Sequence, residues 1–229
     1  MVAAKMDKKD LEQPDAFQEA VGKVMDYARE NRQKLYAASG VLALVIVLGA
    51  GYFFYSAHTE TEAAKVYFEA RMKVMRADPM GTGLAGPEAV KAFEDVVEKY
   101  PSSDAAQGAR YELGNHYYTA GEFDKSIQVY RLFIDKASGK DVRTVYAWFG
   151  IGYAHEAKKE YDKALEAFSR VADSKPGNVH EGLSYRNMAR VYEEMNDRGK
   201  ALDFYKKALE KTKDPTASSL LKRKIAQLG

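Results

Sequence analysis

Apolar and polar residues are distributed most unevenly between residues 35 and 57, where twenty-three consecutive positions carry no charged side chain. Arg32 and Lys34 precede this segment, and Glu60 follows it closely. A helix of this length covers roughly 35 Å at about 1.5 Å per residue, enough to cross a hydrocarbon core of about 30 Å with some tilt. The segment therefore predicts a transmembrane helix rather than a buried core helix.

A cleaved signal peptide is the main alternative for an apolar segment so close to the N-terminus. Signal peptides usually contain an apolar run of about 7–15 residues and end in an A-x-A-like cleavage site. This run is longer, a 34-residue region precedes it, and Tyr55-Ser56-Ala57 is a poor match to such a site. We therefore predict an uncleaved anchor that remains in the membrane.

The charges that flank the apolar segment predict its orientation. Residues 29–34 carry three positive charges and one negative, whereas residues 58–69 carry three glutamates against one lysine. Positively charged flanks favour the cytoplasmic side of a membrane. We thus expect a cytoplasmic arm at residues 1–34, a single-pass helix at 35–57 in the cell inner membrane, and a periplasmic domain over 58–229.

The cytoplasmic arm contains a short amphipathic pattern that predicts a helix beginning after Pro14, with Asp15 as its N-cap. Four apolar residues lie at helical spacing on one face: Phe17, Val21, Val24 and Ala28. Either this face contacts the membrane surface or a cytoplasmic partner, or the helix is solvated and simply leads into the span. The pattern alone leaves both interpretations open.

Two local motifs follow the apolar segment. Thr59-x-x-Glu62 resembles a capping box and predicts that a new helix begins there and runs to about Ala77. Residues 81–86 then match the G-x-G-x-x-G dinucleotide fingerprint letter for letter. That fingerprint requires a preceding buried strand, and here a helical pattern precedes it, so we interpret the glycines as a helix–helix loop.

From residue 87 onward the chain repeats itself. A small residue is followed four positions later by an aromatic one in four successive units, and the aromatic residues are 37, 38 and 37 positions apart. A second signature precedes three of these pairs, as in Leu113-Gly114-x-x-Tyr117. The four pairs are Ala89/Phe93, Ser126/Tyr130, Ala164/Phe168 and Ala201/Tyr205.

These signatures resemble the tetratricopeptide repeat (TPR) pattern, W-x2-L-G-x2-Y, then A-x3-F, then P. The unit at 145–178 matches most closely, departing at Ile151 and His155, whereas the unit at 107–140 has Ser126 where alanine is typical. The resemblance implies an α-solenoid of about three and a half repeats with a C-terminal cap helix. Together with the predicted transmembrane helix at its N-terminal side, this gives an all-α fold. The expected units are 63–101, 107–140, 145–178 and 182–215, with the cap helix at 216–228 and its Lys222, Arg223 and Lys224 exposed.

The TPR resemblance also implies that the first helix of each unit lines a concave, peptide-binding face. We expect a groove that is aromatic at its centre and charged toward its C-terminal end, suited to apolar peptide segments and to carboxylates. The alternative is that several of these rings pack within or between units. The expected groove residues are Tyr111, Asn115, Tyr118, Tyr146, Phe149, Tyr153, Leu183, Arg186, Arg190 and Glu193.

The expected groove differs from the TPR grooves that bind the acidic tails of cytosolic chaperones. Those grooves carry a Lys/Asn set, of which only Asn115 has a counterpart here, while aromatic residues occupy the lysine positions. We therefore disfavour such tails as the ligand.

Composition excludes several function classes. The 35 Lys and Arg residues nearly balance the 33 Asp and Glu residues, and no basic block suggests nucleic-acid binding. There is no cysteine, so disulfides, thiolate metal sites and a lipid-modified N-terminal cysteine are all excluded. The four histidines are scattered and no catalytic motif is present. We expect a protein that is not an enzyme and has no cofactor or metal.

The whole arrangement, a basic-flanked arm, one span and an exported TPR domain, is similar to the bacterial YfgM-type ancillary subunits of the Sec translocon. That resemblance implies translocon subunits, periplasmic chaperones and emerging secreted chains as partners. The alternative is a scaffold for a cell-envelope assembly, such as an outer-membrane biogenesis, secretion or division complex. An enzymatic role is the weakest of the three hypotheses.

Overall fold

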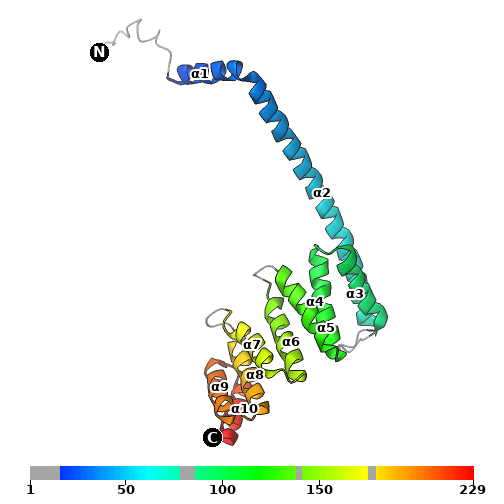
Figure 1. Cartoon of the computed structure of the whole chain (residues 1–229), viewed down its shortest axis with the longest axis vertical. Coiled ribbons are helices and arrows are strands. Elements are labelled where there is room, and N and C mark those ends of the chain that lie inside the picture. Colours follow the sequence, from blue (N-terminus) through cyan, green and yellow to red (C-terminus); the bar gives the residue numbers. More distant parts are fainter. Residues whose placement is uncertain (1–15, 78–85, 138–140, 175–178) are drawn as a thin grey trace, which may run out of the picture. The chain divides into compact units, whose positions relative to one another are not determined.

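The computed structural model describes residues 16–77, 86–137, 141–174 and 179–229, and all regular structure within these residues is α-helical. The predicted all-α class is therefore confirmed (Figure 1). The helices in chain order are α1 (Ala16–Glu30), α2 (Arg32–Ala77), α3 (Pro87–Lys99), α4 (Asp104–Thr119), α5 (Phe123–Lys136), α6 (Arg143–Ala157), α7 (Tyr161–Ala172), α8 (Glu181–Glu194), α9 (Arg198–Lys211) and α10 (Pro215–Leu228).

The chain divides into two compact units, Met1–Ala57 and His58–Gly229, and the division falls within α2. The described part of the first unit consists of α1 and the apolar part of α2. The second unit contains the remainder of α2 and the helices α3 to α10.

The expectation that a new helix begins at Thr59 is wrong, because α2 continues without a break from Arg32 to Ala77. The chain has no Pro or Gly from residue 52 to residue 78, so nothing interrupts the helix at the supposed cap. The Glu62 carboxylate instead pairs with Lys65, one turn further along, at 2.7 Å. The glycine motif at 81–86 lies outside the described residues except for Gly86, which precedes Pro87 as the N-cap of α3.

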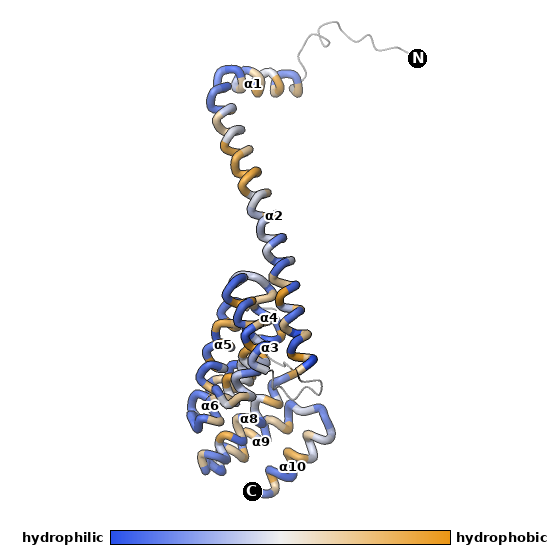
Figure 2. The backbone as a smooth tube through the Cα atoms, turned by 90° about the vertical axis from the view of Figure 1, so that its right-hand side faces the viewer, coloured by the Kyte–Doolittle hydropathy of each residue, from blue (hydrophilic) through white to orange (hydrophobic). Residues whose placement is uncertain are grey.

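Within the described residues, α2 is the one helix that is long and apolar enough, by length and composition, to cross a membrane. No residue of its most apolar 18-residue window is buried. In Figure 2 the strongest orange of α2 lies in its upper part, within this apolar segment. Its side chains are therefore not covered by the described residues of the first unit.

The second unit is a stack of paired helices. α4 packs on α5, α6 on α7 and α8 on α9, each pair contacts the next, and α10 packs on α9 (Figure 1). At the N-terminal end, the last five turns of α2 join α3 and α4 in one apolar cluster. Ala63 and Ala70 of α2 are fully buried in this cluster with Phe93 and Val96 of α3.

Aromatic residues on the second helices of the pairs pack against glycines on the first helices. A Cβ atom built on Gly114 of α4 or on Gly150 of α6 would lie 2.5 Å from the Tyr130 ring, which therefore occupies the space beside both glycines. Gly152 is related in the same way to Phe168, with a separation of 2.4 Å. Only a residue without a Cβ permits such a close approach, which explains the spacing of glycine and aromatic residues in the repeat.

The departure from the TPR pattern at Ser126 has a local explanation. Its side chain is fully buried, and its hydroxyl donates a hydrogen bond to the Gly114 carbonyl oxygen at 2.8 Å. A buried hydroxyl with a partner carries little penalty, so serine replaces the usual alanine without leaving an unpaired polar group.

The turns between the paired helices also repeat. Gly121, Lys159 and Asn196 have φ of 78°, 60° and 59°, the left-handed conformation that commonly ends a helix. In each turn, the next amide bonds back to a carbonyl five residues earlier, as from Glu122 to Tyr117 at 2.8 Å. The stack thus reverses direction by the same turn in three successive units.

Candidate peptide-binding groove

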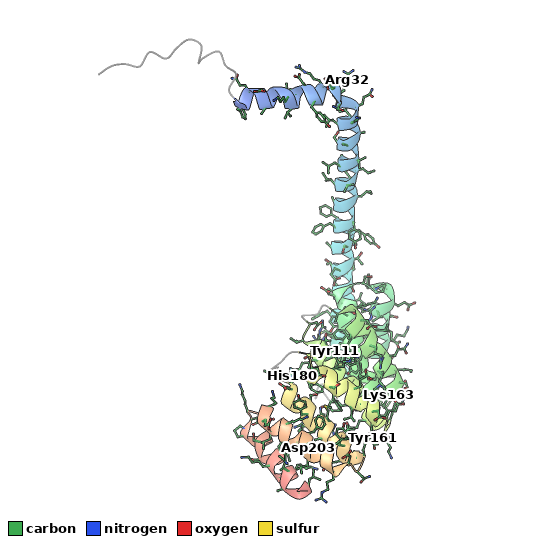
Figure 3. The ribbon with its side chains drawn as sticks, turned by 60° about the vertical axis from the view of Figure 1, so that its left-hand side comes forward. Arg32, Tyr111, Tyr161, Lys163, His180 and Asp203 are labelled. Carbon is green, nitrogen blue, oxygen red and sulfur yellow. The ribbon has the colours of Figure 1, made fainter. Side chains whose placement is uncertain are left out.

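We call the ten expected groove residues the first-helix surface: Tyr111, Asn115, Tyr118, Tyr146, Phe149, Tyr153, Leu183, Arg186, Arg190 and Glu193. They lie on the first helices of three successive pairs, α4, α6 and α8. Figure 3 shows the side chains of these helices, with Tyr111 labelled on α4 and His180 at the start of α8. The structure distinguishes exposed members of this surface from members that are already engaged.

Two tyrosines of the first-helix surface present their rings to solvent. Tyr118 on α4 is 36% exposed and Tyr146 on α6 is 45% exposed. The Tyr118 and Phe123 rings pack at a tilt, and Tyr146 makes a T-shaped contact with His180, with ring centroids 5.7 and 5.2 Å apart. Each ring is thus held from one side and free on another, as a ring that contacts a ligand must be.

Burial and the Glu156 carboxylate raise the pKa of the Tyr118 hydroxyl above its ordinary value. The hydroxyl therefore stays protonated at neutral pH. It remains available to donate a hydrogen bond to a ligand.

Phe149 belongs to the core and not to the surface. It is 4% exposed and packs against Phe168, Tyr153 and His180, each with a centroid distance of 6.2 Å. His180, at the start of α8, was not part of the expected groove. Because His180 at the start of α8 packs against Phe149, the Phe149 ring lies beneath the first-helix surface and is not exposed on it.

Tyr111 and Asn115 are also engaged in packing. The Tyr111 ring lies 5.6 Å from the Phe133 ring and 6.1 Å from the Tyr130 ring. The Tyr130 hydroxyl donates to Asn115 Oδ1 at 2.6 Å. These contacts fix α4 against α5, so Tyr111 and Asn115 act chiefly as structural members of the first-helix surface.

A hydrogen-bonded group connects α6 to α8. Asn187 Nδ2 donates to the Tyr153 hydroxyl at 2.8 Å, and the Arg190 guanidinium lies 5.5 Å above the Tyr153 ring. Arg190 also forms two bonds to the Glu156 carboxylate, from Nε at 2.8 Å and from a terminal nitrogen at 2.6 Å. Both side chains are partly buried, so this two-bond ion pair holds α6 and α8 rigidly together.

Glu193 is satisfied by the C-terminal helices. Its carboxylate accepts from Lys224 of α10 at 3.0 and 3.1 Å, and from the Tyr205 hydroxyl of α9. The expectation that Lys224 is exposed is therefore wrong, because it is partly buried in this ion pair. Helix spacing could have indicated this, since Lys224 follows Leu221 by three residues on the face that packs inward.

Arg186 differs from the other charged members of the first-helix surface. It is half-buried, and none of the described residues forms an ion pair or hydrogen bond with its guanidinium. Asp214, a carboxylate that lines two of the same hollows as Arg186, caps α10 through the Thr216 and Ala217 amides at 3.1 Å each. Arg186 therefore keeps its donor groups for another molecule or for water.

Three adjoining hollows share Arg186 as a lining residue. The first, of about 390 Å³, lies between α8 and the segment that joins α9 to α10 and includes Leu183 and Leu221. The second, of about 490 Å³, extends along α10 past Leu220, and the third, of about 220 Å³, reaches Tyr205 and Lys224. The three linings combine leucines with several cations and one carboxylate, Asp214. The excess of cations beside apolar side chains suits an apolar residue next to a carboxylate.

Sequence reasoning missed the contribution of α10 to these hollows. It treated α10 only as a cap, yet Leu220 is 38% exposed and lines two of the hollows beside Arg186. An exposed leucine on a helix otherwise rich in Ser and Lys was the available signal.

Among the described residues, no group of three or more His, Asp or Glu side chains is placed to hold a metal ion. His155 lies in the turn region of its pair, where its Nδ1 is 2.7 Å from Glu160 Oε2. Hydrogen bonds to this carboxylate from His155, then Lys163 and Lys158, hold the pKa of Glu160 at about 2. This cluster fixes the start of α7 and lies on no hollow described above.

Two family models match the second unit, and both are described as tetratricopeptide repeats. One covers residues 86–141 and the other residues 143–214. Together they span the helices from α3 to α9.

Two curated proteins show significant similarity. Anaphase-promoting complex subunit 3 of Schizosaccharomyces pombe is 28% identical over 139 residues, 60% of this chain and 19% of that protein. Photosystem I assembly protein Ycf3 of Prochlorococcus marinus is 32% identical over 80 residues, 35% of this chain and 45% of that protein. The chain therefore spans less than half the length of each of these relatives.

Solved structures show the same fold. A crystal structure of nearly identical TPR-like repeats, from a Podosopora anserina protein classed as a kinesin light chain, aligns with a TM-score of 0.54 at 14% identity. The alignment covers 74% of this chain and 86% of that one. At this identity the likeness concerns the fold alone.

Proposed function

Because this chain belongs to the tetratricopeptide-repeat proteins, whose repeats bind other proteins, we propose that it is a membrane-anchored, non-catalytic adaptor for peptide segments. Its ligand is an apolar segment of another protein with a carboxylate near one end. The peptide lies across α4, α6 and α8.

The observation that carries this proposal is the half-buried, unpaired Arg186 at the end of a row of exposed tyrosines. Tyr118 and Tyr146 offer partly exposed rings on successive first helices. Beyond them, the hollows around Arg186 combine apolar walls with a cation. Aromatic rings supply contact area to an apolar segment at low entropic cost, and a guanidinium binds a carboxylate through two parallel hydrogen bonds.

The apolar half of α2 supports the membrane part of the proposal. It is long enough to span a bilayer, and none of the residues in its most apolar window is buried. A core helix of a soluble protein would bury such a window. We therefore divide the chain into an arm at 1–34, a span at 35–57 and an interaction domain at 58–229, with the N-terminus in the cytoplasm and the domain in the periplasm.

On this orientation, the ligands are exported proteins. The resemblance to the YfgM-type subunits extends the proposal to the Sec translocon, where the adaptor works with periplasmic chaperones on emerging chains. The position of the groove on a domain next to the span is consistent with such a task.

Site-specific photocrosslinking in intact cells tests the proposal. A photoreactive residue replaces Tyr118 or Tyr146 in one set of variants, and Leu132 on the second helix α5 in the matched control. Leu132 is 44% exposed, close to the exposure of the two tyrosines. We expect adducts with exported chains, chaperones or translocon subunits from positions 118 and 146 only. Equal capture from position 132, or capture of cytoplasmic proteins alone, would contradict the proposal.

A second candidate function is a scaffold within a multi-subunit envelope assembly, such as an outer-membrane biogenesis, secretion or division complex. The two curated relatives favour it, since one is named as a complex subunit and the other as an assembly protein. A scaffold would hold one fixed partner in stable stoichiometry. Co-purification in mild detergent distinguishes the two, because an adaptor would instead return a mixture of exported chains.

A further inference from the structure

Helix α1 has one apolar face that no other described residue of its compact unit covers. Phe17 is 75% exposed, Val24 69% and Val21 44%. These residues follow one another at helical spacing, so they form a single stripe along the helix. Exposed apolar residues gathered on one face indicate an interaction surface.

The opposite face of α1 is charged. Glu19 and Lys23 form an exposed ion pair at 2.8 Å, and Asp26 and Arg29 face each other at 3.8 Å. A helix with one apolar and one charged face matches a boundary between an apolar phase and water.

The position of α1 next to the proposed span identifies that boundary. Asn31 alone separates α1 from α2, and the chain turns there (Figure 1). Helical hydrogen bonds continue through the junction, from the Asn31 amide to the Tyr27 carbonyl and from the Leu35 amide to the Asn31 carbonyl, both at 3.0 Å. Glu30 and Leu35 are therefore only about 8 Å apart along the chain. When residues 35–57 are in a bilayer, the C-terminal end of α1 therefore lies close to its surface.

The junction carries the charges and rings that headgroup regions favour. Arg29, Arg32 and Lys34 outnumber the single Glu30 there. Tyr27 and Tyr36 are exposed at 63% and 74%. Cations next to a span attract anionic headgroups, and tyrosine is enriched at the membrane–water interface.

We infer that α1 is an interfacial helix that lies in the headgroup region of the same bilayer that α2 spans. Its Phe17, Val21 and Val24 side chains enter the acyl boundary, and Glu19, Lys23 and Asp26 face the water. This inference rests on the proposed span. As a consequence, the chain contacts the membrane through both α1 and the adjacent span, and α1 restricts how α2 can tilt and rotate in the bilayer.

Depth measurements by spin labelling test this inference, and the absence of native cysteine makes single labels unambiguous. The full-length chain is reconstituted in vesicles of phosphatidylethanolamine and phosphatidylglycerol. Separate variants carry a label at Val21→Cys on the apolar face, at Asp26→Cys on the charged face, and at Val47→Cys within the span. Collision rates with oxygen, which concentrates in the bilayer, and with a water-soluble nickel complex report the depth of each label.

We expect the label at position 47 to be deep, the label at 21 to be shallow but within the acyl region, and the label at 26 to be in water. If 47 is deep while 21 and 26 are equally aqueous, the inference about α1 is wrong and the span stands. If 47 is aqueous, the span itself is wrong. Spectral broadening at 21 that disappears on dilution with unlabelled chain would assign the apolar face to a second copy and also overturn the inference.

Adding Val24→Glu to the Val21→Cys variant provides a second check. It should shift the label at 21 toward water, because a charge then lies on the apolar face. Adding Glu19→Gln, which changes only the charged face, should leave the depth at 21 unchanged. An equal response to both substitutions would contradict the proposed orientation of the helix.

Discussion

The two halves of α2 have the same backbone conformation, but only one of them buries residues. In the half at 35–57, large apolar side chains are exposed all around the helix. In the half at 58–77, the fully buried residues are small, Ala63 and Ala70, and Tyr67 lies so close to Gly108 of α4 that a Cβ there would be 2.8 Å from its ring. Dense, exposed large apolar residues are typical of a helix that faces lipid, whereas spaced small residues are typical of a helix face that a protein neighbour approaches closely.

The largest expected effect comes from placing a charge in the protein-packed half. Ala70→Arg forces a permanently charged group into a fully buried site beside Phe93 and Val96. A buried charge without a partner destabilises by about 3–5 kcal/mol. We expect a lower midpoint in urea unfolding of the purified chain in detergent, followed by circular dichroism. Membrane retention should be unchanged. An unaltered unfolding midpoint would show that α2 does not pack on α3 and α4.

An arginine in the other half of α2 should impair membrane insertion and leave the stability of the second unit unchanged. Val47→Arg places a charge near the centre of the proposed span, where it disfavours insertion by roughly 2.5–3.5 kcal/mol. We expect less chain in alkali-resistant membranes and no change in the unfolding of the second unit. Full retention would contradict the assignment of residues 35–57 to the bilayer.

Phe68→Arg is the matched control for both arginine variants. Phe68 lies in the second half of α2 but is 64% exposed. An exposed substitution usually changes stability by no more than about 0.5 kcal/mol. Neither unfolding nor retention should change, which would show that burial and not helix position decides the effect.

A smaller effect is expected where α2 caps another helix. The Glu60 carboxylate accepts from the Asp104 and Ala105 amides at 3.1 and 3.3 Å, at the start of α4, where the Ser103 hydroxyl also accepts from the Ala106 amide at 3.0 Å. Glu60→Ala should destabilise the second unit by about 0.5–2 kcal/mol, as loss of a cap does. Hydrogen exchange at residues 104 and 105 should accelerate.

Glu62→Ala is the control, since Glu62 pairs only with the exposed Lys65 of its own helix. It should leave exchange at the start of α4 unchanged. If the two alanine variants behave alike, the link between α2 and α4 does not exist in solution.

The smallest expected effect is a pH dependence of stability in the second unit. The pKa of Glu160 is lowered from its ordinary value near 4.5 to about 2 by hydrogen bonds from His155, Lys163 and Lys158. Its contribution to stability is therefore present above about pH 4.5 and is lost as the pH falls toward 2. The melting temperature of the native chain should exceed that of Glu160→Gln at neutral pH, and the difference should shrink between pH 4.5 and 2.

Membrane retention should not change over this range, because the span contains no titrating acid. Glu166→Gln is the control, since Glu166 forms only an exposed pair with Arg170 at 3.4 Å. A pH-independent difference between the native chain and Glu160→Gln would contradict the role given to this cluster.

The repeat could be predicted from the sequence because it depends on contacts that recur at fixed spacing. Tyr130 and Phe168 fill the space beside Gly114 and Gly152, and such pairs leave the same signature in each unit. Gly121 and Asn196 are residue types that often adopt the left-handed turn conformation, so two of the three turns carry a local signal. Lys159 adopts the same conformation without such a signal.

Parts of the candidate groove could not be predicted because they depend on residues far apart in the chain. Phe149 lies at a groove position by spacing, yet His180, 31 residues later, covers it. Asp214, which lines two hollows with Arg186, caps α10 and forms no ion pair with Arg186 among the described residues. Glu60 contacts an amide 44 residues away, a distance at which no local pattern carries information.

The most direct test of the central claim is protease treatment of intact spheroplasts that contain the chain with an N-terminal tag. If the apolar half of α2 spans the inner membrane and the repeat domain lies outside, external protease should remove the domain and leave a tagged, membrane-embedded fragment that includes residues 1–57. A fully protected chain, or a tagged fragment that alkali releases from the membrane, would contradict the account.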